Sequence, residues 1–479
     1  MEPNVGSRPE LQVRVVSRRL VKAHDHSKEP RADVITVSNL DLIPNTYQAS
    51  VVCIYSKPLT GDFDAVVAAF EAGLPSLLDL FFSLTGRIVT NPRSGVPEIH
   101  CRNQGAELVI GEAGVPLRSL DFSLAETLKS ILVPYADDVP LSVQLVSFTC
   151  GAAASRCRGP TTTWSSTGTA PRGLSGRGPS SRGPVPGPGP EPSPAWEWER
   201  RRATTTRRSA PRDPPSYGAA LDGMFTPFDG RHLVNVLTAK DSVVERLYYV
   251  EAEDIARLQA MASGGGRQRA SRVQAVSAYL WKTLAVVVMA ALSNKRAPAP
   301  PESSKKSKTT CRMGWGGGRA LRAAMRDYVG NVTPYVVVEA AAEAIRGKTM
   351  AEVAAMVRDA IAGVDYDERV RELVDWVEEH KAQDVVEAAT VGLGSPTLSQ
   401  RVWASFPLDT DFGFGHAALA MPTWESEGLC SANFVVTAHP GGNGSWIVGA
   451  DLWPRLAAAL QSDELRIFKL LTAEYLGVY

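Results

Sequence analysis

The chain has 479 residues, which is long enough for two domains with sizeable cores. Lys plus Arg and Asp plus Glu each number 51, so no overall charge indicates nucleic acid or an anionic membrane as a partner. The six Cys are scattered without metal-ligand spacing, which argues against a metal centre and suits a reducing compartment. No secretory signal is recognisable, and we expect a cytoplasmic protein.

Residues 1–150 are predicted to form an α/β domain. The expected strands cover residues 47–55, both sides of a turn at 101–105, and 141–145. Apolar residues at helical spacing predict a helix over 66–81, which Pro75 should kink or divide. The alternation of the last strand slips at Val146, where we expect a bulge. The polar residues 1–33 are expected to be partly loose.

Residues 151–210 differ abruptly in composition. They contain ten Arg, nine Pro and nine Gly, but only one Leu and one Val and no Ile, Met, Phe or Tyr. Such a segment buries too little apolar surface to offset the entropy lost on ordering. We interpret it as a disordered insertion or as a stretch translated out of frame. A basic tract can also bind RNA, but no interleaved aromatic residues support that function.

Residues 211–240 are expected to be a crossover, and residues 241–479 a second α/β domain. Its expected elements are a strand at 243–250, a helix at 273–292, helices over 340–388 broken at Gly347 and Gly363, a hairpin joining 434–437 to 446–448, and a helix at 452–460. Polar residues interrupt the apolar helix at 273–292, so a membrane span is not expected.

Four short motifs occur in order along the chain. They are Gly86-Arg87, Glu98-Ile99-His100-Cys101-Arg102-Asn103-Gln104-Gly105-Ala106, Tyr328-Val329-Gly330-Asn331 and Asp411-Phe412-Gly413-Phe414-Gly415. Taken alone, the last is typical of a buried turn whose aromatic residues lock two Gly into a core. Together the motifs resemble the BAHD acyltransferases of plants, whose Asp-Phe-Gly-Trp-Gly signature differs only at Phe414. The resemblance runs from about Val37 to Cys150 and from about Arg212 to the C-terminus.

The resemblance implies two chloramphenicol-acetyltransferase-like domains, each a mixed sheet with flanking helices, and a substrate channel between them. It implies acyl transfer from acyl-coenzyme A, a co-substrate and not a bound cofactor, to a small alcohol or amine. We favour O-acyl transfer in phenylpropanoid-type metabolism by a monomer. By the same resemblance, Asp411 is structural and pairs with an upstream Arg, either Arg319 or Arg322. The residues beside the acyl-coenzyme A channel are Tyr328, Gly330 and Asn331.

The catalytic base of the family is a His that opens a His-x-x-x-Asp-Gly motif after the strand at 141–149. It removes the acceptor's proton during attack on the thioester. This His and Asp would fall near Thr163 and Thr167, but no His lies between residues 101 and 231. His380 and Asp384 have the spacing without the Gly, in a charged helical stretch typical of a solvated surface.

The sequence therefore indicates an acyltransferase by descent that lacks its catalytic residues. The alternative is a non-catalytic protein that keeps the fold and binds acyl-coenzyme A. A shifted reading frame explains the loss: plausible GC-rich codons for Thr162-Thr163-Trp164-Ser165-Ser166-Thr167-Gly168 can spell His-Leu-Val-Val-Asp-Gly. The string that does so begins at the third base of the Thr162 codon and ends in Gly168.

Overall fold

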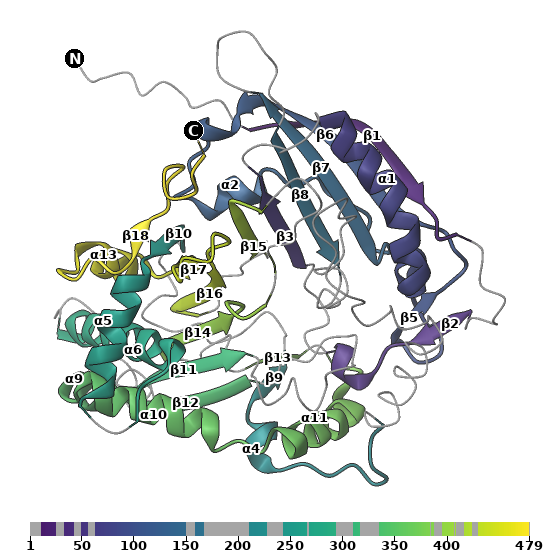
Figure 1. Ribbon diagram of the computed structural model, residues 1–479. Coiled ribbons are helices and arrows are strands. Elements are labelled where there is room, and N and C mark those ends of the chain that lie inside the picture. Colours follow the sequence, from purple (N-terminus) through teal and green to yellow (C-terminus); the bar gives the residue numbers. More distant parts are fainter. Residues whose placement is uncertain are drawn as a thin grey trace, which may run out of the picture.

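The computed structural model describes most of both expected domains. The described residues are 11–24, 33–42, 49–55, 63–149, 159–166, 210–227, 243–265, 268–293, 310–316, 335–383, 385–387, 395–406, 408, 416–423 and 430–478. Two large sheets organise these residues, and helices flank each of them (Figure 1). The mixed α/β class expected from the sequence is confirmed.

The first sheet has six strands in the order β1-β6-β7-β8-β3-β15. Their bounds are β1 Val13–Val21, β6 Ala106–Pro116, β7 Leu141–Thr149, β8 Gly159–Ser166, β3 Ala49–Ile54 and β15 Leu419–Thr423. Helix α1, Phe63–Leu80, covers one face of this sheet (Figure 1). Its buried side chains recur at helical spacing, as expected. The helix is continuous through Pro75, so the expected division there is wrong.

Two further expectations for the first sheet are corrected. Strand β7 pairs with its neighbours without a register shift at Val146, so the expected bulge is absent. The strand is buried on both faces, and apolar residues that point to either face are therefore expected in a regular strand. Strand β1 lies within the residues expected to be partly loose. It is an edge strand with mostly exposed side chains, so its sequence shows little hydrophobic alternation.

The second sheet has seven strands in the order β12-β11-β14-β16-β17-β10-β18. Their bounds are β12 Tyr335–Ala341, β11 Thr310–Gly316, β14 Thr397–Val402, β16 Ala432–Ala438, β17 Trp446–Leu452, β10 Val244–Val250 and β18 Lys469–Leu470. One face packs against a group of helices, α5 Ala252–Ser263, α6 Arg272–Ser293, α9 Ala342–Gly347, α10 Met350–Ala362 and α13 Pro454–Ser462 (Figure 1). The expected hairpin and both helix breaks are confirmed.

Helix α6 is the centre of this second core. By length and hydropathy alone it would be long and apolar enough to cross a membrane. However, Trp281 and Leu284 on this helix are fully buried against the sheet and its neighbouring helices. The helix is therefore explained as the core element of a folded domain.

Smaller elements connect the sheets. They are β2 Val34–Thr36, η1 Asn39–Leu42, η2 Phe82–Thr85, β4 Arg87–Thr90, β5 Pro97–His100, η3 Leu117–Ser119, α2 Ala125–Lys129, α4 Ala219–Asp222, β9 Phe225–Pro227, α11 Tyr366–His380 and β13 Val385–Glu387. Helix α11 begins at an Asp365 cap, whose carboxylate accepts from two backbone N–H groups. An apolar cluster joins α11 to η1 and α4, so it connects both halves of the chain.

The sheets do not follow the expected division of the chain at every strand. Strand β15 belongs to residues 241–479 but pairs antiparallel with β3 in the first sheet. Part of the segment 151–210 is also placed, since residues 159–166 form β8 between β7 and β3. A strand at this position closes the gap between two otherwise separate strands, and Thr and Trp there have high β propensity. Residues 151–158 and 167–209 of this segment lie outside the described part.

Candidate functional site

Most residues singled out from the sequence lie outside the described residues. These are Arg319, Arg322, Tyr328, Gly330, Asn331, the motif Asp411-Phe412-Gly413-Phe414-Gly415, and Thr167. Thr163 is described through the backbone of β8. The predicted pairing of Asp411 with an Arg therefore stays a prediction.

The two large sheets meet at an apolar seam. Its members from the first sheet and its neighbours include Val52, Ile54, Phe122, Ile131, Val146, Leu419 and Met421, and those from the second sheet include Leu247, Tyr249 and Ile447. Polar contacts cross it as well: the backbone N of Leu247 donates to the carbonyl of Ser123 at 2.9 Å. This seam is the place where the resemblance predicts a channel between domains.

Position 163 lies in a lateral row of the first sheet that faces the seam. In register, Met421 pairs with Val52, Val52 with Thr163, and Thr163 with Gln144. Val52 and Met421 are buried in the seam, and Nε2 of Gln144 donates to the carbonyl of Ile131 at 2.7 Å. Directly paired residues of antiparallel strands share one face. The position expected for the catalytic His is thus a seam position.

A second row, which is polar, faces the seam from the second sheet. Glu245 pairs with Asp451, Asp451 with Asn433, and Asn433 with Ser399, across four adjacent strands. These residues alternate along their strands with buried core residues on the helix side, so they share the seam face. A polar row at a buried interface is unusual for a purely structural surface.

Hydrogen bonds and ion pairs orient this second row. Nη1 of Arg401 donates to Oδ1 of Asn433 at 3.2 Å, and Nδ2 of Asn433 donates to Oδ2 of Asp451 at 3.2 Å. Lys129 of α2 pairs with Glu245 at 2.7 Å across the seam. Burial and the carboxylate of Asp451 together raise the pKa of the Cys430 thiol to about 12.

A hollow of about 20 Å³ lies between the two rows. Its lining includes Thr423 from the first sheet, Asp451 from the second, and Lys129 from α2. The hydroxyl Oγ1 of Thr423 is buried and has no hydrogen-bond partner within the described part of the protein. The methyl end of Met421 reaches Gly449 on the opposite side, where a Cβ would come to 3.2 Å. The two sheets are in direct contact beside this hollow.

The first two family motifs form one structural unit away from the seam. A Cβ on Gly86 would lie 2.7 Å from the carbonyl oxygen of His100, so the strand can pass only a glycine there. Gly105 has φ +106° and would clash with the carbonyl of Val21. The side chain of Asn103 bonds the backbone of Ala23 in both directions. These motifs connect η2, β5 and β1.

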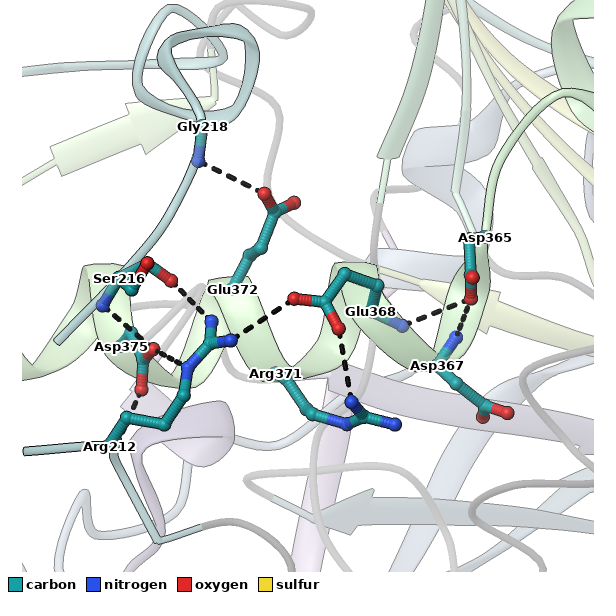
Figure 2. A network of polar contacts seen from close by, with 9 residues as sticks. All are labelled: Arg212, Ser216, Gly218, Asp365, Asp367, Glu368, Arg371, Glu372 and Asp375. Carbon is teal, nitrogen blue, oxygen red and sulfur yellow. Dashed lines mark hydrogen bonds and ion pairs between the residues drawn. The ribbon is translucent and has the colours of Figure 1, made fainter.

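The crossover has a polar anchor of its own (Figure 2). Arg212 pairs with Asp375 and Glu368 of α11, and Asp375 also accepts from the backbone N of Ser216 at 2.9 Å. The backbone N of Gly218 donates to Glu372 at 3.0 Å. The first described residues after the segment 151–209 are thus attached to the second half of the chain by specific contacts.

His100 and His380 are both held by contacts with neighbouring side chains. Nε2 of His100 bonds Glu98 at 2.9 Å, and hydrogen bonds from Asn91 and His100 lower the pKa of that carboxyl. His380 ends α11 and stacks on Trp376 at 4.1 Å, so it is packed, not solvated as expected. Among the described residues, no group of three His, Cys, Asp or Glu could hold a metal ion.

Sequence reasoning missed the second row. Its members are separated by up to 206 positions, from Glu245 to Asp451, and strand register alone brings them together. The available signal was the alternation in Ala432–Ala438, where Asn433 and Thr437 interrupt an otherwise apolar strand in the phase opposite to Phe434. Without the strand order, that signal does not identify a partner.

A family match covers most of the chain. The model of the Transferase family matches residues 11–157 and 198–467. Residues 158–197, which lie between the two matched stretches, fall inside the segment of aberrant composition. The match therefore excludes the region around Thr163 and Thr167.

Two rice proteins (Oryza sativa subsp. japonica) are similar to the chain over nearly its full length. They are putrescine hydroxycinnamoyltransferase and putrescine hydroxycinnamoyltransferase 3, each 25% identical, over 458 and 446 residues respectively. Each alignment covers 90% of this chain and 94% of the rice protein.

Two solved structures share the fold. TRI101 of F. graminearum, complexed with coenzyme A and deoxynivalenol, covers 91% of this chain and 99% of its own, with a TM-score of 0.69 and 13% identity. Vinorine synthase covers 96% of this chain and 99% of its own, with a TM-score of 0.62 and 18% identity. The two-domain fold expected from the resemblance is confirmed.

Proposed function

The chain belongs to the Transferase family, the BAHD acyltransferases, and on this premise we propose that its reaction moves an acyl group from acyl-coenzyme A to an amine. The sequence alone favours an alcohol as acceptor. The two rice relatives, however, are named for transfer to putrescine, a diamine, and this supports an amine. An alcohol of phenylpropanoid type is the second candidate. TRI101, by its description, binds coenzyme A, which supports acyl-coenzyme A as co-substrate.

The observation that carries this proposal is the register of position 163. It lies at the seam, in the row of Val52 and Gln144, where a base would meet substrates held between the domains. A His at this position would take a proton from the acceptor nitrogen as that nitrogen attacks the thioester carbonyl. A C–N bond forms, the C–S bond breaks, and the proton passes to the departing thiolate, so the products are an amide and coenzyme A.

The printed chain carries Thr163 instead, and we propose that it is impaired for this reason. Such a base typically contributes about 10²–10⁴ in rate. The gap in the family match at residues 158–197 supports a lesion confined to the aberrant segment, with intact sequence on both sides. The competing function is a non-catalytic protein that binds acyl-coenzyme A without turnover.

The test compares the printed chain with a frame-restored chain in which the segment 151–210 is translated in the shifted frame. Coenzyme A release from several acyl thioesters is measured with amine and alcohol acceptors. We expect turnover from the frame-restored chain and at most about 10⁻² of it from the printed chain. Saturable thioester binding without turnover by both chains would favour the non-catalytic function. Equal turnover by both would refute the assignment of the base to position 163.

A further inference from the structure

We infer that Gln144 is a positioning residue for the proposed acyl transfer, and that it holds the stretch after α2 against the strands that carry the base position. This inference rests on the proposed function, because it takes position 163 as the place of the base. It adds to that site a second residue, which lies outside the four family motifs.

Gln144 is the residue directly paired with position 163 on one side. The two lie on the adjacent antiparallel strands β7 and β8, and Thr163 is paired on its other side with Val52. Directly paired residues of antiparallel strands lie on one face of the sheet, with Cβ atoms about 4.5–5.5 Å apart. A base at position 163 therefore has the side chain of Gln144 as its lateral neighbour.

The amide of Gln144 is buried, and both of its ends are used. The residue is 4% exposed and lies between Val143 and Leu145, which are fully buried. Its Nε2 donates to the carbonyl of Ile131 at 2.7 Å, and its Oε1 accepts from the backbone N of Val133 at 2.9 Å. A buried amide without such bonds would destabilise the fold. Gln144 thus fixes the backbone of two residues that belong to no helix or strand.

The stretch held in this way lies between the two sheets. Ile131 is fully buried in the apolar seam, together with residues of both sheets. Earlier in the same stretch, the carbonyl of Ser123 accepts from the backbone N of Leu247 at 2.9 Å. Lys129 pairs with Glu245 at 2.7 Å. Residues 123–133 are therefore attached to the second sheet at one end and to the base-bearing face of the first sheet at the other, so they set the spacing of the sheets beside the base.

The amide also leaves the position beside the base uncharged. Charged groups on the neighbouring elements include two balanced pairs, Glu107 with Arg18 at 2.8 Å and Lys129 with Glu245. A carboxylate in place of the amide would add a negative charge that favours the protonated form of an adjacent imidazole. The contact between positions 144 and 163 therefore has an electrostatic signature, which a contact that only stabilises the fold does not have.

The first experiment measures this signature without turnover. Thr163→His is introduced into the full printed chain, alone and together with Gln144→Glu, and the new imidazole is titrated by NMR, its signal being identified by comparison with the parent. Gln144→Glu keeps an oxygen that accepts from Val133. The control is Gln383→Glu, which adds the same charge at an exposed residue after α11. Melting curves identify variants that fail to fold, and the frame-restored chain is the second host.

We expect Gln144→Glu to raise the pKa of the introduced imidazole by about 1 unit or more, and Gln383→Glu to leave it unchanged. A pKa that is the same with and without Gln144→Glu would show that the two positions are not neighbours, and would overturn the inference.

The second experiment separates positioning from stability. In the frame-restored chain, Gln144→Met keeps the length of the side chain but makes neither amide bond. We expect kcat to fall by about tenfold or more, with less than about a threefold change in the KM for acyl-coenzyme A. The control is Gln259→Met on α5, which removes an amide bond of 3.0 Å to the carbonyl of Ala270 on the helix side of the second sheet. It should lower stability and leave kcat unchanged.

Unchanged kcat in Gln144→Met, or an equal loss in Gln259→Met, would overturn the positioning role. A frame-restored parent without turnover, in which the imidazole still responds to Gln144→Glu, would refute the proposed function and confirm that the two positions are neighbours.

Discussion

Arg212 and Asp375 join the crossover to helix α11 through both backbone and side chain. The backbone N of Arg212 donates to Oδ1 of Asp375 at 2.8 Å, and its Nε pairs with Oδ2 (Figure 2). Asp375 has a side chain that is 1% exposed, so the crossover provides the partners that its buried carboxylate requires. The same helix contacts the first half of the chain, because Asn39 donates to the carbonyl of Val374 at 2.9 Å.

Asp375→Asn should therefore lower the free energy of unfolding. The substitution removes the negative charge and replaces one acceptor oxygen by a donor that faces Arg212 and Ser216. Leaving these groups unsatisfied costs about 1–3 kcal/mol. Denaturant unfolding of the variant and its parent measures the difference. Glu368→Gln is the control, since that side chain is 43% exposed and its pair with Arg212 should contribute less than about 1 kcal/mol.

The same carboxylate predicts how stability depends on pH. Burial alone would raise the pKa of Asp375, but hydrogen bonds from the backbone of Arg212 and Ser216 and from the Arg212 side chain outweigh it and lower the pKa. A lowered pKa stabilises the fold above the unfolded-state pKa of about 3.9 and loses this contribution as pH falls through the folded-state value. Between pH 5 and pH 2, the parent should lose more stability than Asp375→Asn. Parallel curves would contradict this.

Local pattern was enough to predict most elements of this fold. Helical spacing located α1 and α6, and Gly347 and Gly363 correctly marked the breaks that separate α9, α10 and α11. Pattern failed where burial hides periodicity: β7 is buried on both faces, and alternation does not describe it. It also failed for β15, because no local signal shows that a strand late in the chain pairs with β3.

The glycine motif gives a prediction about backbone conformation. Gly105→Ala should destabilise the protein by about 1–2 kcal/mol, because a Cβ is strained at positive φ. The Cβ would also meet the carbonyl oxygen of Val21 at 2.9 Å. Gly114→Ala in β6 is the matched control, since nothing lies within 4 Å of its Cβ position. Thermal melting should separate the two variants, and equal melting temperatures would show that the turn relaxes.

Lys282 gives a prediction about the second core. Its Nζ donates to the carbonyls of Ile345 and Arg346 at 3.2 and 3.1 Å, and also to that of Lys348. It therefore caps the C-terminal end of α9, where unpaired carbonyls favour a cation. Lys282→Met keeps the aliphatic stem and should destabilise by about 1–2 kcal/mol in urea unfolding. Lys381→Met, which removes a surface pair with Glu378, should change stability by less than about 1 kcal/mol.

The candidate site was less predictable than the fold for a physical reason. The second row assembles from β10, β17, β16 and β14, so its chemistry depends on strand order and register. The resemblance predicts that the missing base falls near Thr163, after the strand Leu141–Thr149. The register of Thr163 with Val52 and Gln144 then gives that position a place at the seam.

The last prediction concerns the reading frame of the transcript across residues 150–211. Trp164 has the single codon TGG, and GC-rich codons are assumed for the flanking Thr, Ser and Gly. With ACC-ACC-TGG-TCG-TCG-ACG-GGG for Thr162 to Gly168, reading from the third base of the first codon gives CAC-CTG-GTC-GTC-GAC-GGG. This encodes His-Leu-Val-Val-Asp-Gly, the family motif, which follows β7 in the chain and begins within the residues of β8. We expect transcript sequencing to show codons compatible with this motif and an insertion or deletion near each end of residues 158–197, the part that the family match omits. Codons that cannot encode His and Asp in the shifted frame would refute the frameshift, and the segment would then be a genuine insertion.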